Sequence, residues 1–289
     1  MKAIAIVLIT ILSVTSGYAQ KRTTEIPFTM DRNLILIKAK ASDNKEYGFI
    51  YDTGTTGVVL SEVLVNDLGL KITGSTFMQS PNSTKPDTVS TVTIPTLKLN
   101  GFELKNHEAV SVPPHQIFSP NASGIIGLSA FKGNLVTIDY AQSKLIIKKG
   151  KLNASDKSVV KVNLSMVPET KINVNGEEML AVFDCGGPET ISFPMEWKSK
   201  LKLKSEPVLY AKARTPGGEV EMYKAQMAGT VSFGSVELKD PGITLVTGGF
   251  HAINFGYPFL KNYRTTIDMV NQLMRFDAIS LPSQPRPEK

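Results

Sequence analysis

Residues 49–61 read FIYDTGTTGVVLS, in which an apolar run ends in Asp52 and a second apolar run follows a turn rich in Thr and Gly. The short apolar run before the acid is typical of a buried strand. A buried carboxylate is costly unless another group shares its site. The stretch therefore raises the question of whether Asp52 has a partner elsewhere in the chain.

A second acid stands in the same setting. Residues 171–184 read KINVNGEEMLAVFD, in which an Asn-Gly turn typical of a hairpin precedes an apolar strand that runs into Asp184. Asp52 also ends a hairpin, with a first strand at 34–37 and a polar turn at 42–45. Both acids begin an Asp-x-Gly motif, and they lie 184 − 52 = 132 residues apart.

The closing part of each copy repeats as well. Gly127 and Gly256 lie 256 − 127 = 129 residues apart, and a Thr-Ile-Asp stretch follows each of them. Two independent matches at nearly equal offset predict an internal repeat of two strand-rich units. Asp139 and Asp268, which end the Thr-Ile-Asp stretches, are interpreted as turn residues that open the last hairpin of each unit.

Strand patterns dominate the chain and helical signals are short. Helices are expected at 61–70, where Gly69 would end the helix, and at 194–203. The sequence therefore predicts an all-β protein. The expected division is a signal peptide at 1–19, an N-terminal lobe at 20–152, a C-terminal lobe at 153–280 and a polar tail at 281–289, with the joint near 150–158.

The N-terminus has the composition of an export signal. Lys2 precedes an apolar stretch at 3–12, and small residues lead to a cleavage site after Ala19. The apolar stretch is short for a membrane span, which disfavours the alternative of an N-terminal anchor. We expect a secreted or periplasmic protein that has no membrane attachment once the signal is cleaved.

The composition narrows the classes of partner. The chain has 289 residues, 42% of them hydrophobic, and a formal net charge of +6. Its basic residues are scattered without interleaved aromatic residues, so no nucleic-acid partner is expected. Cys185 is the single cysteine, which excludes an internal disulfide. The three His residues lack the spacing of metal ligands, and neither a metal nor another cofactor is expected.

Asp52-Thr53-Gly54-Thr55, followed by Ile-Ile-Gly at 125–127, resembles the lobe signature of the aspartic proteases, in both their retropepsin-like and pepsin-like branches. The second Asp-x-Gly motif extends the resemblance over nearly all of the mature chain as two tandem lobes. The fold that the resemblance implies is all-β, with two pseudo-twofold related β-barrel-like lobes and short helices.

The resemblance implies a catalytic dyad of Asp52 and Asp184. Gly54 and Gly186 would let the two loops approach each other closely. Two adjacent carboxyl groups share one proton, as is known for aspartic proteases. The ionised carboxyl would then take a proton from a water molecule, while the protonated one hydrogen-bonds the scissile carbonyl.

Neighbouring residues would support this dyad. By resemblance, the hydroxyl of Thr53 reaches across to the opposite loop, and that of Thr55 bonds the first acid. The second copy departs from this pattern, because Cys185 replaces a Thr or Ser, Gly187 lacks a hydroxyl, and Asn254 interrupts the second apolar-apolar-Gly. A thiol donates poorly, so we expect a looser interlock on that side.

Covering hairpins over a substrate cleft are expected from residues 74–95 and 205–225, the second with a turn at 216–218. The first region has no Tyr, which favours the retropepsin-like branch. Phe77 and Met78 could line the cleft or belong to the core. An extended peptide in the cleft would be held by backbone hydrogen bonds.

The resulting hypothesis is a monomeric aspartic endopeptidase that acts on peptides or proteins through Asp52 and Asp184. One alternative is a peptide- or protein-binding module of the same fold with weak or no activity, marked by Cys185 and Gly187. Another is that each lobe self-associates, so that dyads form between chains. A thiol protease that pairs Cys185 with His251 is a fourth interpretation.

Overall fold

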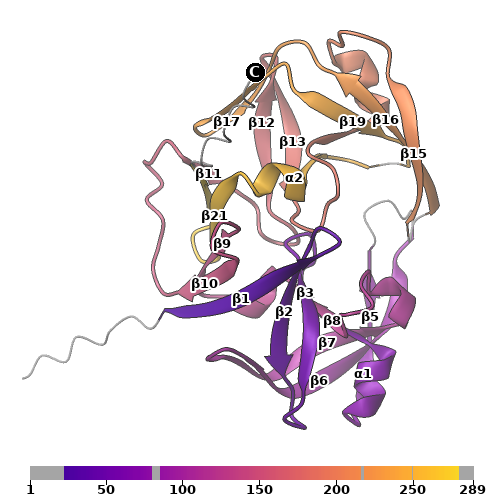
Figure 1. The fold of residues 1–289 in the computed structure, drawn as a ribbon, viewed down its shortest axis with the longest axis vertical. Coiled ribbons are helices and arrows are strands. Elements are labelled where there is room, and N and C mark those ends of the chain that lie inside the picture. Colours follow the sequence, from indigo (N-terminus) through magenta and orange to yellow (C-terminus); the bar gives the residue numbers. More distant parts are fainter. Residues whose placement is uncertain (1–22, 80–84, 216–217, 249, 280–289) are drawn as a thin grey trace, which may run out of the picture.

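The computed structural model describes residues 23–79, 85–215, 218–248 and 250–279. These residues form mainly β-strands, arranged as two lobes with the first half of the chain below and the second half above in Figure 1. The expected all-β fold of two lobes is confirmed. The expected signal peptide, the polar tail and most of the turn at 216–218 lie outside the described residues.

The larger sheet contains thirteen strands in the order β11-β22-β21-β9-β10-β1-β2-β3-β8-β4-β7-β6-β5. Strands from the first half of the chain make up most of it, and three strands from the second half extend one edge. Their bounds are β1 (Thr24–Asp31), β2 (Leu34–Lys40), β3 (Glu46–Tyr51), β4 (Val58–Ser61), β5 (Ile72–Met78), β6 (Asp87–Leu99), β7 (Phe102–Val112), β8 (Gly124–Ile126), β9 (Leu135–Asp139), β10 (Lys144–Lys148), β11 (Val159–Lys161), β21 (Tyr263–Asp268) and β22 (Leu273–Ala278).

The smaller sheet contains nine strands in the order β15-β16-β19-β14-β20-β13-β12-β17-β18, all from the second half. Their bounds are β12 (Glu169–Val174), β13 (Glu177–Phe183), β14 (Ser192–Pro194), β15 (Val208–Thr215), β16 (Gly218–Gln226), β17 (Thr230–Phe233), β18 (Val236–Lys239), β19 (Gly242–Val246) and β20 (Ile253–Phe255). The helices are α1 (Glu62–Asp67), α2 (Tyr257–Leu260) and the 3-10 helices η1 (Pro114–Gln116), η2 (Leu128–Phe131) and η3 (Met195–Lys200). None of the helices in the described part of the chain has the length and apolar character of a membrane span.

The two hairpins that lead to the acids form as expected. β2 and β3 pair antiparallel, and alternate residues of β2 are buried, as a half-buried strand requires. β12 and β13 pair around Asn175 and Gly176, which both have positive φ (53° and 95°), the geometry of a tight hairpin turn. Strand β2 continues to Lys40, beyond the expected end at residue 37.

One predicted helix is confirmed and the other differs. The Ser61 side chain accepts a hydrogen bond from the Leu64 amide at the start of α1, and Gly69 follows its end with φ +59°. The segment expected to be helical at 194–203 is instead the short 3-10 helix η3. The 3-10 helix ends at Lys200 because the residues that follow pair with a distant segment, in which Leu203 forms a β-bridge to Met227.

The two halves repeat the same strand pairings around their acids. In the first half β3 pairs parallel with β8, β8 pairs antiparallel with β4, and β4 pairs parallel with β7. In the second half β13, β20, β14 and β19 pair in the same order and directions. The sequence repeat therefore corresponds to a structural repeat.

The halves meet where β9 pairs antiparallel with β21, beside each other in Figure 1. Thr137 lies opposite Thr266, and their hydroxyl oxygens are 2.9 Å apart in a buried position. These two residues are equivalents in the repeat, since 266 − 137 = 129. A residue that pairs with its own equivalent lies at the pseudo-twofold axis, so the two acids are related across this junction.

Candidate active site

Each acid leaves its strand at the same point of the repeated pattern. The Asp52 amide donates to the Ile126 carbonyl at 3.1 Å, and the Asp184 amide donates to the Phe255 carbonyl at 3.0 Å. These bonds continue the parallel pairs β3–β8 and β13–β20 by one residue. The strands that precede Gly127 and Gly256, β8 and β20, thus fix where each acid-bearing loop begins.

The structure brings the two acids together. A Cβ atom added to Gly54 would lie 2.6 Å from Asp184 Oδ1, and one added to Gly186 would lie 2.8 Å from Asp52 Oδ1. The carboxyl group of Asp52 is also close enough to that of Asp184 to raise the pKa of Asp184. Each carboxyl therefore packs against the glycine of the opposite loop, which has no room for a side chain.

Both carboxyl groups receive one backbone and one side-chain hydrogen bond. Asp52 accepts from the Gly54 amide at 2.8 Å through Oδ1 and from the Thr55 hydroxyl at 2.9 Å through Oδ2. Asp184 accepts from the Gly186 amide at 2.8 Å through Oδ1 and from Asn254 Nδ2 at 3.2 Å through Oδ2. Thr55 thus has the position expected for it, whereas the contact of Asn254 was not anticipated from the sequence.

Thr53 and Cys185 interlock the two loops. The Thr53 hydroxyl donates to the Phe183 carbonyl at 2.9 Å and accepts from the Cys185 amide at 2.8 Å. In return, the Cys185 sulfur accepts from the Thr53 amide at 3.3 Å and donates to the Tyr51 carbonyl at 3.5 Å. Cys185 thus keeps the bonding pattern of a hydroxyl residue, with the longer bonds of a larger and weaker donor.

The environment shifts the protonation of the second acid. Burial raises the pKa of Asp184 well above its ordinary value, and the charge of Asp52 adds to this effect. Two carboxyl groups in contact cannot both ionise freely, so the pair retains a proton at pH values where an isolated carboxyl would have lost it. This is the protonation state in which one carboxyl accepts a proton while the other donates one.

The thiol of Cys185 has a different character. Its side chain is fully buried, and burial followed by the charge of Asp52 raises the pKa of the thiol well above its ordinary value. Its sulfur bonds to backbone groups, and His251 is exposed. A nucleophilic cysteine requires a lowered pKa and a base within reach, so this site does not support a thiol-protease mechanism.

Asp139 and Asp268 are confirmed as turn residues. Both are fully buried. Asp139 accepts from the Gln142 amide at 3.1 Å and forms an ion pair with Arg264, while Asp268 accepts from the Asn271 amide at 2.9 Å. These bonds hold the turns that open the last hairpin of each half.

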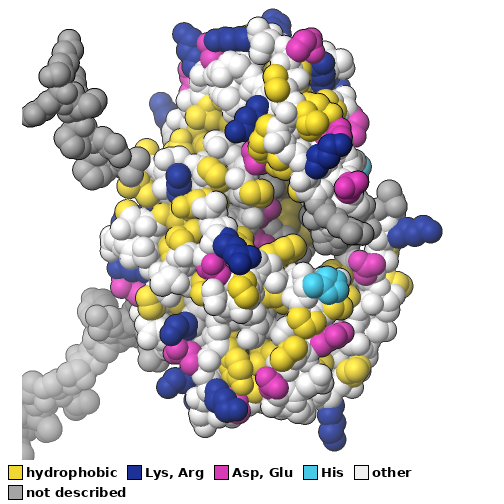
Figure 2. All heavy atoms as spheres, turned by 45° about the vertical axis from the view of Figure 1, so that its right-hand side comes forward, with side chains coloured by type: hydrophobic (Ala, Val, Ile, Leu, Met, Phe, Trp, Pro, Cys, Tyr) yellow, Lys and Arg dark blue, Asp and Glu magenta, His cyan; other side chains and the backbone are white. Residues whose placement is uncertain are grey.

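A hollow lies between the two halves on the face shown in Figure 2, with acidic side chains at its floor. The hairpins β5–β6 and β15–β16 end the larger and smaller sheets, and Figure 1 shows β5 and β15 facing each other on one side of the molecule. Phe77 on β5 is 74% exposed, which excludes it from the core, whereas Met78 packs partly buried against core residues.

Tyr210 on the second hairpin is a residue that the sequence did not single out. The register of β15 against β16 shifts between Leu209 and Ala211, so Tyr210 is the extra residue of a β-bulge. Its hydroxyl donates to Glu189 Oε1 at 2.6 Å, and the Thr244 hydroxyl donates to Glu189 Oε2 at 2.6 Å. Burial and the bond to Glu189 raise the pKa of Tyr210 to about 12. The bulge therefore ties this hairpin to the loop that follows Asp184.

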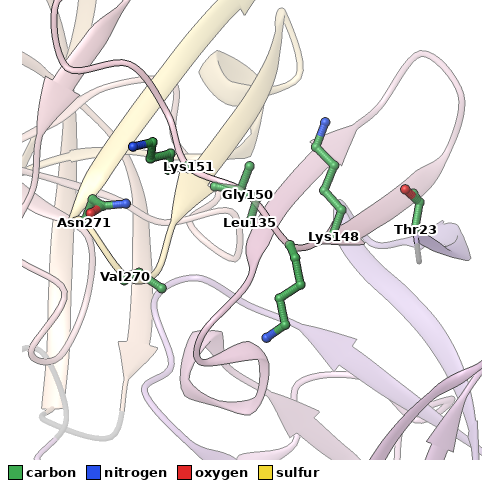
Figure 3. A pocket seen from close by; sticks show the side chains of 8 residues that line it. Thr23, Leu135, Lys148, Gly150, Lys151, Val270 and Asn271 are labelled. Carbon is green, nitrogen blue, oxygen red and sulfur yellow. The ribbon is translucent and has the colours of Figure 1, made fainter. Parts of the chain in front are cut away.

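A second depression, of about 750 Å³, lies away from the dyad and is lined in part by Lys148, Lys149 and Lys151. The labelled lysine side chains in Figure 3 point in different directions, and Lys149 Nζ donates to the Gly133 carbonyl at 2.8 Å. The ammonium groups do not converge on one point. Among the described residues, no three His, Cys, Asp or Glu side chains form a group that could hold a metal ion.

Comparison with known proteins finds a match for part of the first lobe. A family model described as aspartyl protease matches residues 37–130, which include the Asp52 motif and Gly127. A comparison with curated proteins gives no match. The family match, which covers part of the first lobe, and the two-lobed all-β fold support an assignment to the aspartyl protease superfamily. The paired Asp-x-Gly loops are consistent with this assignment.

Proposed function

We propose that the protein is an aspartic endopeptidase that cleaves peptides or proteins with a water molecule activated between Asp52 and Asp184. The observation that carries the proposal is the reciprocal packing of each carboxyl group against the glycine of the other loop. Such packing, together with three hydrogen bonds from donors in the two loops and one from Asn254 on β20, holds the two carboxyl groups close together in one orientation. Preorganised acids of this kind suit general acid–base catalysis.

The reaction would proceed from the pair that holds one proton. The ionised carboxyl takes a proton from water, and the oxygen of that water attacks the carbonyl carbon of the scissile bond. The protonated carboxyl gives its proton to the carbonyl oxygen, which forms a neutral gem-diol. The pair then gives its proton to the amide nitrogen, and the carbon–nitrogen bond breaks. A hydroxyl of the gem-diol gives its proton to the pair as the carboxylic acid product forms, which restores the starting state.

Substrate would bind as an extended chain between the two hairpins. β5 and β15 are edge strands, so their outer backbone groups are available to a strand added alongside. Large apolar side chains are exposed on both of them. These are Ile72 and Phe77 on β5, and Val208, Leu209 and Tyr210 on β15. This composition favours peptides with apolar side chains near the cleaved bond.

The proposal includes the location, the oligomeric state and the partners of the enzyme. The composition of residues 1–19 supports export to the periplasm or the exterior, with no membrane attachment after cleavage. Asp52 and Asp184 come from one chain, which supports a monomeric enzyme over dyads formed between chains. The scattered basic residues support a peptide or protein substrate and no nucleic acid.

The test is hydrolysis of a mixed peptide library by the mature chain between acid and neutral pH. Asp52→Asn and Asp184→Asn should each lower cleavage by about 1,000-fold or more, since each removes one half of the acid–base pair. Asp156→Asn is a matched control, because Asp156 is an acid in an exposed turn that bonds Ser158.

Retained cleavage in either dyad variant would contradict the proposal. Peptides that bind to the wild-type protein without being cleaved under any condition would instead identify a binding module of the same fold.

A further inference from the structure

The two departures in the second copy of the motif are related to each other. Gly187 stands where Thr55 stands in the first copy, since 187 − 55 = 132, so the second copy has lost a hydroxyl. Asn254 stands where Ile125 stands, since 254 − 125 = 129, so the second copy has gained an amide. Viewed in sequence these are two separate irregularities, about 70 residues apart.

In the folded protein Gly187 and Asn254 lie next to each other, beside the carboxyl group of Asp184. Thr55 donates to Oδ2 of Asp52 at 2.9 Å, and Asn254 donates to Oδ2 of Asp184 at 3.2 Å. The amide has therefore taken over the donor role of the missing hydroxyl. A Cβ atom on Gly187 would lie 3.2 Å from Asn254 Nδ2, so a side chain at 187 and this amide would compete for the same space.

No second hydrogen bond from the described residues holds the Asn254 side chain in this position. Its side chain is half-buried on β20, and within the described part of the chain its Oδ1 is buried without a hydrogen-bond partner. Its side-chain bond among those residues is the one to Asp184. A buried amide oxygen without a hydrogen-bond partner carries a desolvation cost. An apolar residue such as Ile125, which occupies the equivalent position in the first half, would avoid this cost, so packing alone does not explain an Asn at position 254.

We propose that Asn254 is the positioning residue of the second acid, and that its amide sets the range of pH over which the pair holds a single proton. The proposal rests on the proposed function only for its effect on hydrolysis, because the protonation of Asp184 can be measured without substrate.

The chemistry of the donor gives the direction of the effect. An amide NH₂ group donates and does not accept, whereas a hydroxyl does both. Asn254 therefore favours the ionised form of Asp184 and lowers its pKa, against the opposing effects of burial and Asp52. The other groups coupled to this acid are Cys185 and Tyr140, whose pKa values are raised by burial so that both stay neutral.

The central variant is Asn254→Leu, which keeps the size of the side chain and removes the donor. Asn254→Ala combined with Gly187→Ser clears the space beside residue 187 and returns a hydroxyl to the position that Thr55 occupies in the first half. Asn134→Leu is the matched control, because Asn134 is also half-buried and its Nδ2 donates to the Phe131 carbonyl away from the dyad. Asn254→Ser removes the reach of the amide with a smaller side chain, should the leucine variant fail to fold.

Two measurements are expected to agree. Carboxyl ¹³C NMR, with the signal assigned by Asp184→Asn, should show the pKa of Asp184 moving up in Asn254→Leu and Asn254→Ser. The alkaline limb of the kcat/KM profile should move up with it, while kcat at the optimum falls about tenfold, as expected for one lost hydrogen bond to a charged group. The double variant should recover part of both changes, and Asn134→Leu should lower only the Tm.

An unchanged Asp184 titration in Asn254→Leu would overturn the proposal and leave Asn254 a structural residue. A downward shift would also overturn it, since the amide would then be accepting the proton of Asp184. If wild-type protein cleaves nothing while the NMR shift occurs as expected, the proposed function fails and the positioning role of Asn254 stands.

Discussion

Thr53 and Cys185 each receive the backbone amide of the other on their side chains, with N–H···O at 2.8 Å in one direction and N–H···S at 3.3 Å in the other. Both side chains are buried at the base of the dyad. The two halves are thus locked by a pair of residues of different chemistry in equivalent positions, and the first two predictions concern the two sides of this lock.

Thr53→Val should destabilise the protein by about 3 kcal/mol, because it leaves the Phe183 carbonyl and the Cys185 amide without partners in a buried site. Activity should fall by at least tenfold, since the acids would lose their fixed separation. Thr53→Ser keeps the hydroxyl and should retain most of the stability and most of the activity. Denaturant titration and kcat/KM measure the two effects, and equal behaviour of the two variants would contradict the role of the hydroxyl.

Cys185→Thr should stabilise the protein by about 1 kcal/mol, because a hydroxyl bonds the Tyr51 carbonyl more strongly than a thiol does. We also expect hydrolysis to increase, since the dyad would be held more firmly. Cys185→Ala removes both sulfur bonds and should show the opposite changes. A lower Tm for Cys185→Thr would show that the buried site is shaped for sulfur and cannot take the added methyl group.

The sequence predicted those residues of the site that belong to a recognisable motif, and it missed those whose contacts depend on strand pairing. Asp52, Asp184 and Thr53 belong to a short motif that occurs twice, so their convergence could be inferred from the repeat alone. Asn254 could not, because its contact with Asp184 depends on the register of β20 beside β13. Its change from an apolar residue was visible, but only the fold shows that it compensates for Gly187.

Asp184→Asn should change the pH dependence of stability. Because burial and Asp52 raise the pKa of Asp184 in the folded state, the folded protein holds this proton more tightly than the unfolded chain does. Below the unfolded value of 3.8 the group is protonated in both states and has no effect, whereas at higher pH it opposes folding. The Tm of Asp184→Asn relative to wild type should therefore rise between pH 3.5 and pH 7.

Asp156→Asn provides a control of opposite sign. Hydrogen bonds from Ser158 lower the pKa of Asp156, so this acid favours folding above its unfolded pKa and loses that effect as pH falls. Its replacement should lower the relative Tm toward neutral pH. If the relative Tm of both variants changed with pH in the same direction, burial of Asp184 would not govern its protonation.

Tyr210→Phe should loosen the second hairpin while leaving the dyad unchanged. The variant loses the hydrogen bond to Glu189, which joins the bulge of β15 to the loop after Asp184. We expect faster amide exchange in β15 and β16 and an increase in KM of about threefold to tenfold, as one neutral donor to a carboxylate would give. Tyr223→Phe, which removes a bond between neighbours within β16, serves as the control. Equal exchange in both variants would contradict the anchoring role of Tyr210.

The bulge also shows a second limit of prediction from sequence. The two strands around residues 205–225 could be expected from their apolar and turn residues, and β15 and β16 lie there. The pattern does not show where one strand gains a residue relative to its partner. Tyr210 therefore gave no signal, although the extra residue is what directs its side chain toward Glu189.

The pairing of β9 with β21 has a consequence for how the chain reaches its folded state. During synthesis β9 is complete long before β21 exists, so one side of it exposes unpaired backbone groups for most of that time. An unpaired strand edge is a template for another molecule, and the self-complementary position of Thr137 would let two nascent copies join in register. The final hairpin therefore both completes the fold and covers the site at which premature association would begin.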